Sequence, residues 1–303
     1  MQRLALRMPN WVGDALMVLP IIDGLTALNI EVELLGKSWL ADLFSGYNVT
    51  TFNIPPQLFK AQQEYKRILA KDVVLFTNSI RSAAAASLAN KNTVGYLTVG
   101  RSIFLTHGLK KAQGLHETEY FFNLAAYAVN NIFAKSLTKK PEFKLKIGQN
   151  SVKNAEDILL SNNINANYLV LCPGATGHGV NGESKVWPYW DGLIKALIKQ
   201  KIALIACPAN NEIEKFTQIF PREVKILPGV NLSTYAAIMQ SSKLVIANDS
   251  GPLHLAAAVN AQVLGLFGVS SPKRVAPKNA YILGELGKWP LLSQVLQALK
   301  EYL

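Results

Sequence analysis

Short apolar runs alternate with helix-like patterns along the chain, and this alternation limits the fold more than any other feature. Strands are predicted at residues 3–8, 31–35, 49–54, 73–76, 168–172, 203–207, 224–227, 244–247 and 263–267. Helices are predicted at residues 15–28 (with a kink at Pro20), 39–44, 117–133, 189–199, 211–219, 233–240 and 253–259. Strands and helices that alternate in this way form parallel sheets with helices on both faces. The pattern therefore predicts an α/β fold.

The length of 303 residues exceeds what a single hydrophobic core usually organises. We expect two Rossmann-like, doubly wound domains, at residues 1–148 and 149–303, with the boundary in a polar stretch near residues 146–151. Doubly wound sheets bind ligands at the carboxyl ends of their strands. The two domains are therefore expected to face one interdomain cleft.

The composition is that of a folded, basic protein. Half of the residues are hydrophobic, 17% are charged, and the formal net charge is +11. Such a surface attracts nucleic acid, an anionic membrane face or a phosphorylated substrate, or is simply well solvated. The basic residues lack the aromatic interleaving of nucleic-acid-binding proteins, so we expect no nucleic-acid partner.

Cys172 and Cys207 each end an apolar run, which favours buried thiols over a disulfide. The four histidines lie far apart, so neither a metal site nor a cofactor is expected. Nowhere do about 18 apolar residues follow one another, as a spanning helix requires. We expect a cytoplasmic protein, with possible peripheral contact with the inner membrane surface.

The segment Asn248-Asp249-Ser250-Gly251-Pro252-Leu253-His254 follows a predicted buried strand. It predicts a tight turn and then a helix whose positive end and backbone N–H groups can bind an anion such as a pyrophosphate. His254 is expected on the first exposed turn of this helix. Alternatively, Asp249 and Ser250 only cap the helix, because both residue types are favoured at that position.

The first loop, Met8-Pro9-Asn10-Trp11-Val12-Gly13-Asp14, offers a second candidate site. Gly13 lets the backbone approach a ligand closely, and Asp14 stands at the predicted start of a helix. Asp14 is either a capping residue or a general base that takes a proton from a substrate hydroxyl.

Two further charged residues follow strands of the second half. Lys185 is either a solvated loop residue or a cation placed over a pyrophosphate, where it would neutralise the charge of a leaving nucleotide. Glu212 is either an exposed first-turn residue or an acceptor for ribose hydroxyls. The loop at residues 227–232 can form the wall of a base pocket or be an ordinary connection.

Together these segments resemble the ADP-heptose:lipopolysaccharide heptosyltransferases of glycosyltransferase family 9, over nearly the whole chain. Asp249 to Ala258 is similar to the family pattern D-[ST]-G-x-x-H-x-x-A-A, and Pro173-Gly174-Ala175 with Lys185-x-Trp187-Pro188 resembles a second signature. The stretches Trp11–Asp14 and Asn78–Ala83, with Arg101, resemble the heptosyltransferase II branch most closely.

The resemblance implies a GT-B architecture, with the acceptor bound by the N-terminal domain and the nucleotide sugar by the C-terminal domain. A last helix at about residues 291–303 would pack back on the first domain. Asp14 would be the catalytic base, and Lys185 would lie near the diphosphate. The implied donor-binding residues are Thr176, Glu212 (ribose), Val230 (adenine), Asp249, Ser250, Gly251 and His254. The implied acceptor-binding residues are Trp11, Gly13, Asn78, Ser79, Arg81 and Arg101.

The expected activity is an inverting, metal-independent transfer of heptose from ADP-heptose to a lipid A-linked inner-core oligosaccharide, as in heptosyltransferase II. Alternatives are heptosyltransferase I, another nucleotide-sugar glycosyltransferase, and a nucleotide-sugar epimerase of the same architecture. A protein that only binds a nucleotide sugar is a further alternative.

Overall fold

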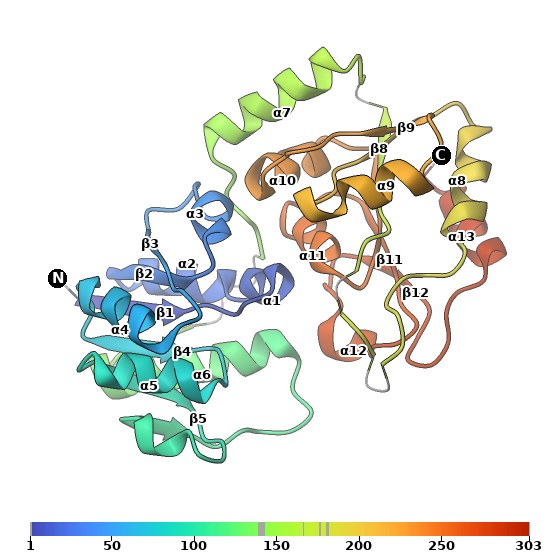
Figure 1. Ribbon diagram of the computed structural model, residues 1–303. Helices are drawn as coiled ribbons and strands as arrows, with labels where there is room; N and C mark the ends of the chain where they lie inside the picture. The colour runs from blue at the N-terminus through green and yellow to red at the C-terminus, as the bar shows by residue number, and fades with distance from the viewer. Residues whose placement is uncertain (1, 139–142, 166, 176, 180–181, 303) are drawn as a thin grey trace. The chain divides into compact units, whose positions relative to one another are not determined.

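The computed structural model describes residues 2–138, 143–165, 167–175, 177–179 and 182–302. The chain divides into two compact units, Met1–Lys146 and Ile147–Leu303. Each unit is an α/β fold built around one sheet (Figure 1).

The sheet of the N-terminal unit has the strand order β3-β2-β1-β4-β5-β6, and every neighbouring pair is parallel. Its strands are β1 (Gln2–Arg7), β2 (Ile30–Gly36), β3 (Thr50–Asn53), β4 (Asp72–Leu75), β5 (Asn92–Tyr96) and β6 (His107–Leu109). This is the order of a Rossmann sheet, in which the first and fourth strands lie side by side at the centre.

Helices cover the faces of this sheet. They are α1 (Val12–Leu16), α2 (Leu19–Ala27), α3 (Trp39–Leu43), α4 (Leu58–Arg67), α5 (Ile80–Leu88) and α6 (Glu117–Phe133), with a 3-10 turn η1 (Ser102–Phe104). Helix α2 packs against α6, and α4 packs against α5. The single helix predicted at residues 15–28 is wrong: α1 ends at Leu16, and Pro20 lies in the first turn of the separate helix α2, where its missing N–H costs nothing.

The C-terminal unit repeats the plan with the order β12-β11-β10-β7-β8-β9, again with parallel neighbours. Its strands are β7 (Tyr168–Cys172), β8 (Ala203–Ala206), β9 (Val224–Ile226), β10 (Leu244–Asn248), β11 (Val263–Leu266) and β12 (Tyr281–Leu283). Its helices are α7 (Gln149–Ser161), α8 (Trp190–Ile198), α9 (Ile213–Ile219), α10 (Leu232–Gln240), α11 (Gly251–Ala258), α12 (Pro272–Val275) and α13 (Leu292–Leu299), with the 3-10 turn η2 (Asn210–Glu212).

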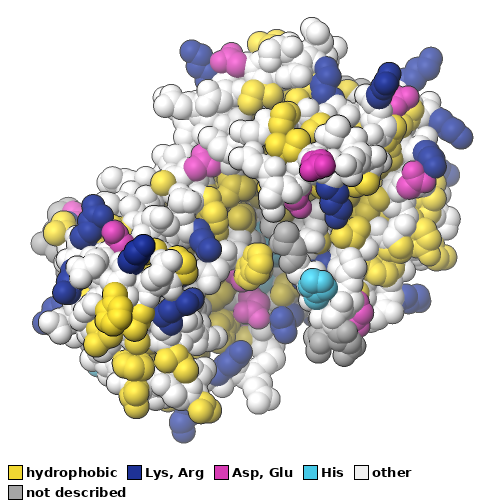
Figure 2. Space-filling view, viewed as in Figure 1, with side chains coloured by type: hydrophobic (Ala, Val, Ile, Leu, Met, Phe, Trp, Pro, Cys, Tyr) yellow, Lys and Arg dark blue, Asp and Glu magenta, His cyan; other side chains and the backbone are white. Residues whose placement is uncertain are grey.

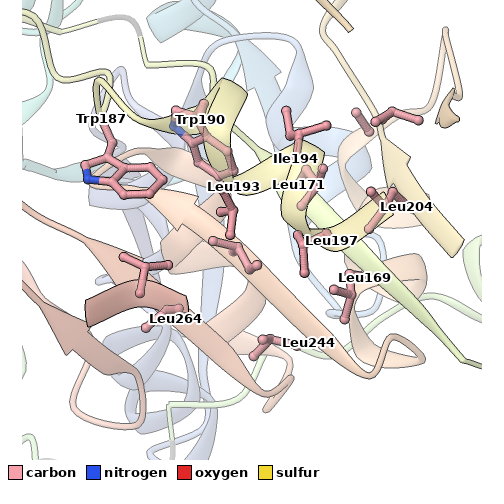
Figure 3. Close-up of a cluster of buried hydrophobic side chains, with 14 of the residues drawn as sticks. Leu169, Leu171, Trp187, Trp190, Leu193, Ile194, Leu197, Leu204, Leu244 and Leu264 are labelled. Atoms are coloured by element: carbon pink, nitrogen blue, oxygen red, sulfur yellow. The ribbon is translucent and has the colours of Figure 1, made fainter. Parts of the chain in front are cut away.

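One face of this second sheet is covered by α8, α9 and α13. Leu169 and Leu171 stand two residues apart on β7 and so point to the same side of the sheet. There they pack under α8, where Leu193 and Leu197 lie one turn apart (Figure 3). Val295 and Leu299 of α13 belong to the same core, so the helix expected at residues 291–303 packs within its own unit.

The α/β class with two doubly wound parallel sheets, predicted from the alternation, is confirmed. None of the helices in the described part of the chain combines the length and hydropathy that a bilayer span requires.

Candidate functional site

Polar residues gather where the strand order of each sheet reverses. In the C-terminal unit this switch lies between β7 and β10, and in the N-terminal unit between β1 and β4. Adjacent loops diverge at a switch point, and ligands of open α/β sheets bind in the crevice this leaves at the carboxyl edge. Lys185 and Asp249 follow β7 and β10, whereas Asp14 and Asn78 follow β1 and β4.

At the C-terminal switch point, Lys185 and Asp249 form an ion pair. Lys185 Nζ lies 2.7 Å from Asp249 Oδ2, and the side chains are 24% and 7% exposed. Ser270 Oγ donates to the same Oδ2 at 2.5 Å. The backbone of Gly177 packs along the Lys185 stem, because a Cβ added there would lie 3.4 Å from Lys185 Cδ. Lys185 is therefore held at the site and is not a freely solvated loop residue.

The turn after β10 feeds directly into helix α11. The helix begins at Gly251, and Ser250 occupies the N-cap position, with its hydroxyl donating to the carbonyl of Asn248 at 3.2 Å. The Asp249 carboxylate accepts hydrogen bonds from Lys185 and Ser270, so the alternative that Asp249 merely caps the helix is wrong. The amino end of α11 therefore places its positive dipole and the Gly251 N–H at the edge that carries Lys185, whereas Pro252 has no N–H and the Leu253 N–H donates to the Ser250 carbonyl.

His254 was expected on an exposed turn of the helix, and this prediction is wrong. Its side chain is only 6% exposed, and the surrounding helix α11 is buried at Leu253 and Leu255. The apolar composition of α11 explains this result, because a helix that is hydrophobic all round is covered on every side.

Asn248 joins the loops of this edge. Its Oδ1 accepts from the backbone N–H of Trp187 and from Trp190 Nε1, both at 3.1 Å, and its Nδ2 donates to the carbonyl of Pro173 at 2.6 Å. Asn248 is fully buried. One amide thus fixes the turn after β7, the segment that carries Lys185, and the start of α8.

Two other predicted donor-binding residues, Glu212 and Val230, follow strands β8 and β9 at the same edge. Glu212 accepts from the N–H of Ala209 at 3.3 Å, and its Oε1 lies 3.0 Å from where a Cβ of Gly174 would stand. Val230 is half-buried in the loop that follows β9. Thr176, also predicted to contact the donor, lies outside the described residues.

In the N-terminal unit, Asp14 is half-buried in the first turn of α1. Trp11 occupies the N-cap position of this helix and makes no side-chain capping bond, so Asp14 stands in the first turn and not at the N-cap itself. Trp11 is 62% exposed and Gly13 is buried, so the indole of Trp11 faces solvent while the backbone at Gly13 lies inside the unit.

Arg7 fixes the loop that precedes α1. Its Nη1 donates to the carbonyl of Met8 at 2.5 Å, and its Nη2 donates to Asn10 Oδ1 at 3.0 Å. Burial lowers the pKa of the Arg7 guanidinium, which nonetheless stays charged at neutral pH. The loop leading to Asp14 is therefore anchored on a buried cation.

A second buried guanidinium belongs to Arg101, which is inaccessible to solvent. Its Nη1 donates to Asn78 Oδ1 at 2.9 Å and to the carbonyl of Tyr96 at 3.1 Å, and Asn78 Nδ2 donates to Tyr120 OH at 2.9 Å. Arg101 was predicted to contact the acceptor. In the structure it is buried, and its hydrogen bond orients the Asn78 side chain. Burial lowers the pKa of Arg101 and raises that of Tyr120.

Ser79 and Arg81 lie beside Asn78. Ser79 is the N-cap of α5, and its hydroxyl accepts from the N–H of Ser82 at 3.4 Å. Arg81 is exposed on the same helix. These residues share the carboxyl edge of the sheet with Asp14.

The two cysteines are free thiols, and of the two predicted to be buried, Cys172 is buried and Cys207 is half-buried. Cys172 is buried 3.0 Å from the hydroxyl of Tyr235, and burial raises the pKa of Cys172 to about 12. The thiol therefore stays protonated at neutral pH and is a poor nucleophile. Among the described residues, no cluster of three or more His, Cys, Asp or Glu side chains has the arrangement of a metal site.

Sequence reasoning missed three residues that organise these edges: Arg7, Asn248 and Ser270. Each is the last residue of a strand or stands a few residues beyond one, where side chains project toward the carboxyl edge. A polar residue at or just after the end of an apolar run was the sequence feature that could have indicated them. Its partners could not be predicted, because they belong to loops distant in the sequence.

Comparison with known proteins identifies the fold and the family. The model of glycosyltransferase family 9 (heptosyltransferase) matches residues 62–288. The chain belongs to glycosyltransferase family 9. The resemblance to this family noted in the sequence is therefore confirmed.

Among curated proteins, lipooligosaccharide heptosyltransferase 2 of Haemophilus influenzae is 32% identical over 116 residues. This alignment covers 35% of the chain and 32% of the length of that relative.

Among solved structures, E. coli ADP-heptose LPS heptosyltransferase II superposes with a TM-score of 0.77 at 18% identity, over 100% of this chain and 98% of that one. E. coli heptosyltransferase WaaC with ADP-2-deoxy-2-fluoro heptose gives a TM-score of 0.72 at 21% identity, over 99% of both chains. These likenesses confirm the GT-B fold class for this member of glycosyltransferase family 9.

Proposed function

We propose that this protein transfers a heptose from ADP-heptose to the inner core of lipopolysaccharide, as heptosyltransferase II does. The observation that carries the proposal is the Lys185–Asp249 ion pair at the amino end of α11, at the switch point of the second sheet. This arrangement suits a diphosphate. The similar proteins, two heptosyltransferases II and a heptosyltransferase solved with an ADP-heptose analogue, support this choice of donor and branch.

On the donor side, Lys185 and the amino end of α11 would stabilise the charge that grows on ADP as the glycosidic bond breaks. Ser250, Gly251 and His254 would shape this pocket, and Thr176 stays a predicted donor-binding residue. Glu212 would accept hydrogen bonds from the ribose hydroxyls. Val230 would contact the adenine.

On the acceptor side, Asp14 would deprotonate the attacking hydroxyl, which displaces ADP with inversion at the anomeric carbon. The transition state would resemble an oxocarbenium ion, as in glycoside hydrolysis. Trp11, Gly13, Asn78, Ser79 and Arg81 would contact the acceptor, and Arg101 would act through Asn78. The buried cations Arg7 and Arg101 give this edge a positive potential, which suits a phosphorylated or carboxylated core sugar.

The function is tested by incubating the purified protein with ADP-heptose and a panel of core-truncated acceptors, with products identified by mass spectrometry. We expect one heptose to be added to an acceptor that already carries the first heptose. Addition to the acceptor that lacks heptose would instead indicate heptosyltransferase I. An altered sugar nucleotide formed without acceptor would indicate an epimerase, and ADP binding without any product would indicate a protein that only binds the donor.

We further propose that the N-terminal unit meets an anionic lipid surface through the loop between β5 and η1. Val99 and Ile103 are 98% and 82% exposed there. Gly100 lies between them, and a Cβ on it would stand 3.3 Å from Cδ1 of Ile80, another exposed apolar side chain. These side chains form an apolar projection, which we call the β5–η1 patch (Val99, Ile103 and Ile80).

The segment of chain that carries the β5–η1 patch has charges of one sign. Residues 73–116 contain no Asp or Glu, but they include Arg81, Lys110 and Lys111, which are exposed. Figure 2 shows hydrophobic side chains gathered on this unit, with many Lys and Arg and fewer Asp and Glu side chains around them. Apolar side chains ringed by cations favour an anionic bilayer, since the chains insert while the cations remain at the headgroups.

The double substitution Val99→Glu with Ile103→Glu is expected to weaken binding to phosphatidylglycerol vesicles by at least about tenfold, because two apolar side chains become anionic. Cosedimentation measures the effect. The matched control is Leu160→Glu, which places a charge on an equally apolar, exposed position of α7 near Glu156 and Asp157. Equal binding by the wild type and the double variant, or equal binding to phosphatidylcholine vesicles, would contradict the proposal.

A further inference from the structure

We propose that Ser270 is a positioning residue, whose hydroxyl holds the Asp249 carboxylate while Lys185 moves from Asp249 to the diphosphate of the donor. The inference rests on the proposed function, because it treats Lys185 as the cation of the donor site. It adds a residue that lies outside the family signatures found in the sequence.

The geometry places two donors on one carboxylate oxygen. Lys185 Nζ lies 2.7 Å and Ser270 Oγ 2.5 Å from Asp249 Oδ2. The Asp249 side chain is only 7% exposed, so water solvates it poorly. A carboxylate in such surroundings depends on the protein for its hydrogen bonds.

Lys185 is the member of this group that can exchange Asp249 for another anion. Its side chain is 24% exposed and carries a compact charge on a four-carbon stem, which can change rotamer more easily than a serine. A diphosphate bound at the start of α11 carries more negative charge than Asp249 and competes for the ammonium. When Lys185 leaves, Asp249 keeps the hydrogen bond from Ser270. Without the hydroxyl, donor binding would strip a nearly buried carboxylate of both partners.

Ser270 itself stands on a fixed stretch of chain. Asp249 N–H donates to the carbonyl of Leu266, the last residue of β11, at 3.3 Å. Two residues farther on, Gly268 packs so closely on the indole of Trp289 that a Cβ would lie 2.0 Å from the ring. The loop that carries the hydroxyl is therefore set by packing and needs no ligand to place it.

The test measures ADP affinity of the full chain by calorimetry. Ser270→Val, which keeps the shape of threonine without the hydroxyl, is expected to weaken ADP binding by about tenfold, whereas Ser270→Thr retains most of the affinity. The matched control Ser271→Ala, at the N-cap of α12 where the side chain makes no capping bond, is expected to leave affinity unchanged.

A double-mutant cycle separates positioning from general damage. In a Lys185→Ala background no ammonium is left to move, so adding Ser270→Val is expected to change ADP affinity by less than about twofold. A merely structural role predicts the same loss in both backgrounds, and that result would overturn the proposal. Equal affinities of the Thr and Val variants would also overturn it. Circular dichroism melting curves establish that each variant is folded.

The outcomes distinguish this inference from the proposed function. ADP binding with the expected coupling, but without heptose transfer to any acceptor, would remove the proposed function and keep the role of Ser270. Heptose transfer by the wild type, with additive effects of Lys185→Ala and Ser270→Val on ADP affinity, would keep the proposed function and remove the role of Ser270.

Discussion

Replacing Asp14 with Asn is expected to lower the turnover of heptose transfer by about 10²–10⁴-fold, which is the contribution a general base typically makes. The amide has the shape of the carboxylate but cannot accept the proton of the acceptor hydroxyl. ADP affinity is expected to remain within about twofold of the wild type, because Asp14 belongs to the N-terminal unit and the proposed donor pocket to the other. Single-turnover kinetics with saturating ADP-heptose isolates the chemical step.

The matched control for Asp14 is Asp72→Asn. Asp72 is a half-buried carboxylate of the same unit, but it begins β4 and so lies at the amino edge of the sheet, opposite the carboxyl edge that carries Asp14. We expect this variant to turn over at the wild-type rate. Full activity of Asp14→Asn, or an equal loss in both variants, would show that Asp14 is not the base.

The pH dependence adds a second readout. A general base must be ionised, so kcat/KM of the wild type is expected to fall at acidic pH, as the base becomes protonated. The residual activity of Asp14→Asn should lack this acidic limb. The comparison separates loss of a proton acceptor from a small displacement of the loop, which would lower the rate at every pH alike.

Most strands were predictable from sequence, including the edge strands β3 and β9, whereas β5, β6 and β12 were not. Strands β1, β4, β7 and β10 each contain at least three consecutive apolar residues, because helices bury them on both faces. In contrast, β5 opens with Asn92 and Thr93, and β6 and β12 have three residues each, so their composition does not separate them from loops. These strands form only through pairing with a neighbour already in place.

Helices with a long apolar face were likewise predictable from sequence, and helices without one were not. Helix α6 has a long apolar face and was predicted with its observed bounds. Helix α4 buries only Ala61 and Tyr65, and most of its residues are polar, so it has too few apolar residues to be recognised as a helix of the core. Helix α5 is rich in alanine, whose small side chain marks no face clearly.

For the candidate site, the sequence indicated which strand ends carry chemistry but not which side chains touch. Asp249 and Lys185 were both expected near a diphosphate, and their direct ion pair is a finding of the structure. The capping alternative for Asp249 failed because Ser270, on the next strand's loop, competes for the same carboxylate. Such competition depends on strand order, and strand order is a tertiary property.

Replacing Asn248 with Leu is expected to destabilise the C-terminal unit by about 3–5 kcal/mol. The two side chains are similar in size, but leucine leaves the Trp187 N–H, Trp190 Nε1 and the Pro173 carbonyl without their partner, and each buried unpaired group costs about 1–3 kcal/mol. For a unit of this size the melting temperature should fall by about 10 °C. Differential scanning calorimetry of the full chain measures the change.

The matched control for Asn248 is Asn279→Leu. Asn279 also donates through Nδ2 to a backbone carbonyl, that of Ala257 at 2.8 Å, but it is exposed, so water replaces the lost bond. A loss below about 1 kcal/mol is expected there. Equal melting temperatures for the two variants would show that the Asn248 amide does not organise this edge.

A second substitution, Asn248→Asp, separates stability from positioning. The carboxylate can still accept from the Trp187 N–H and Trp190 Nε1 but can no longer donate to the Pro173 carbonyl, and it stands next to Asp249. Two adjacent carboxylates compete for the Lys185 ammonium, so ADP affinity should fall further than the loss of folded protein explains. Calorimetric titration below the melting transition measures that affinity. If affinity changes only in proportion to the unfolded fraction, Asn248 supports the fold without placing Lys185.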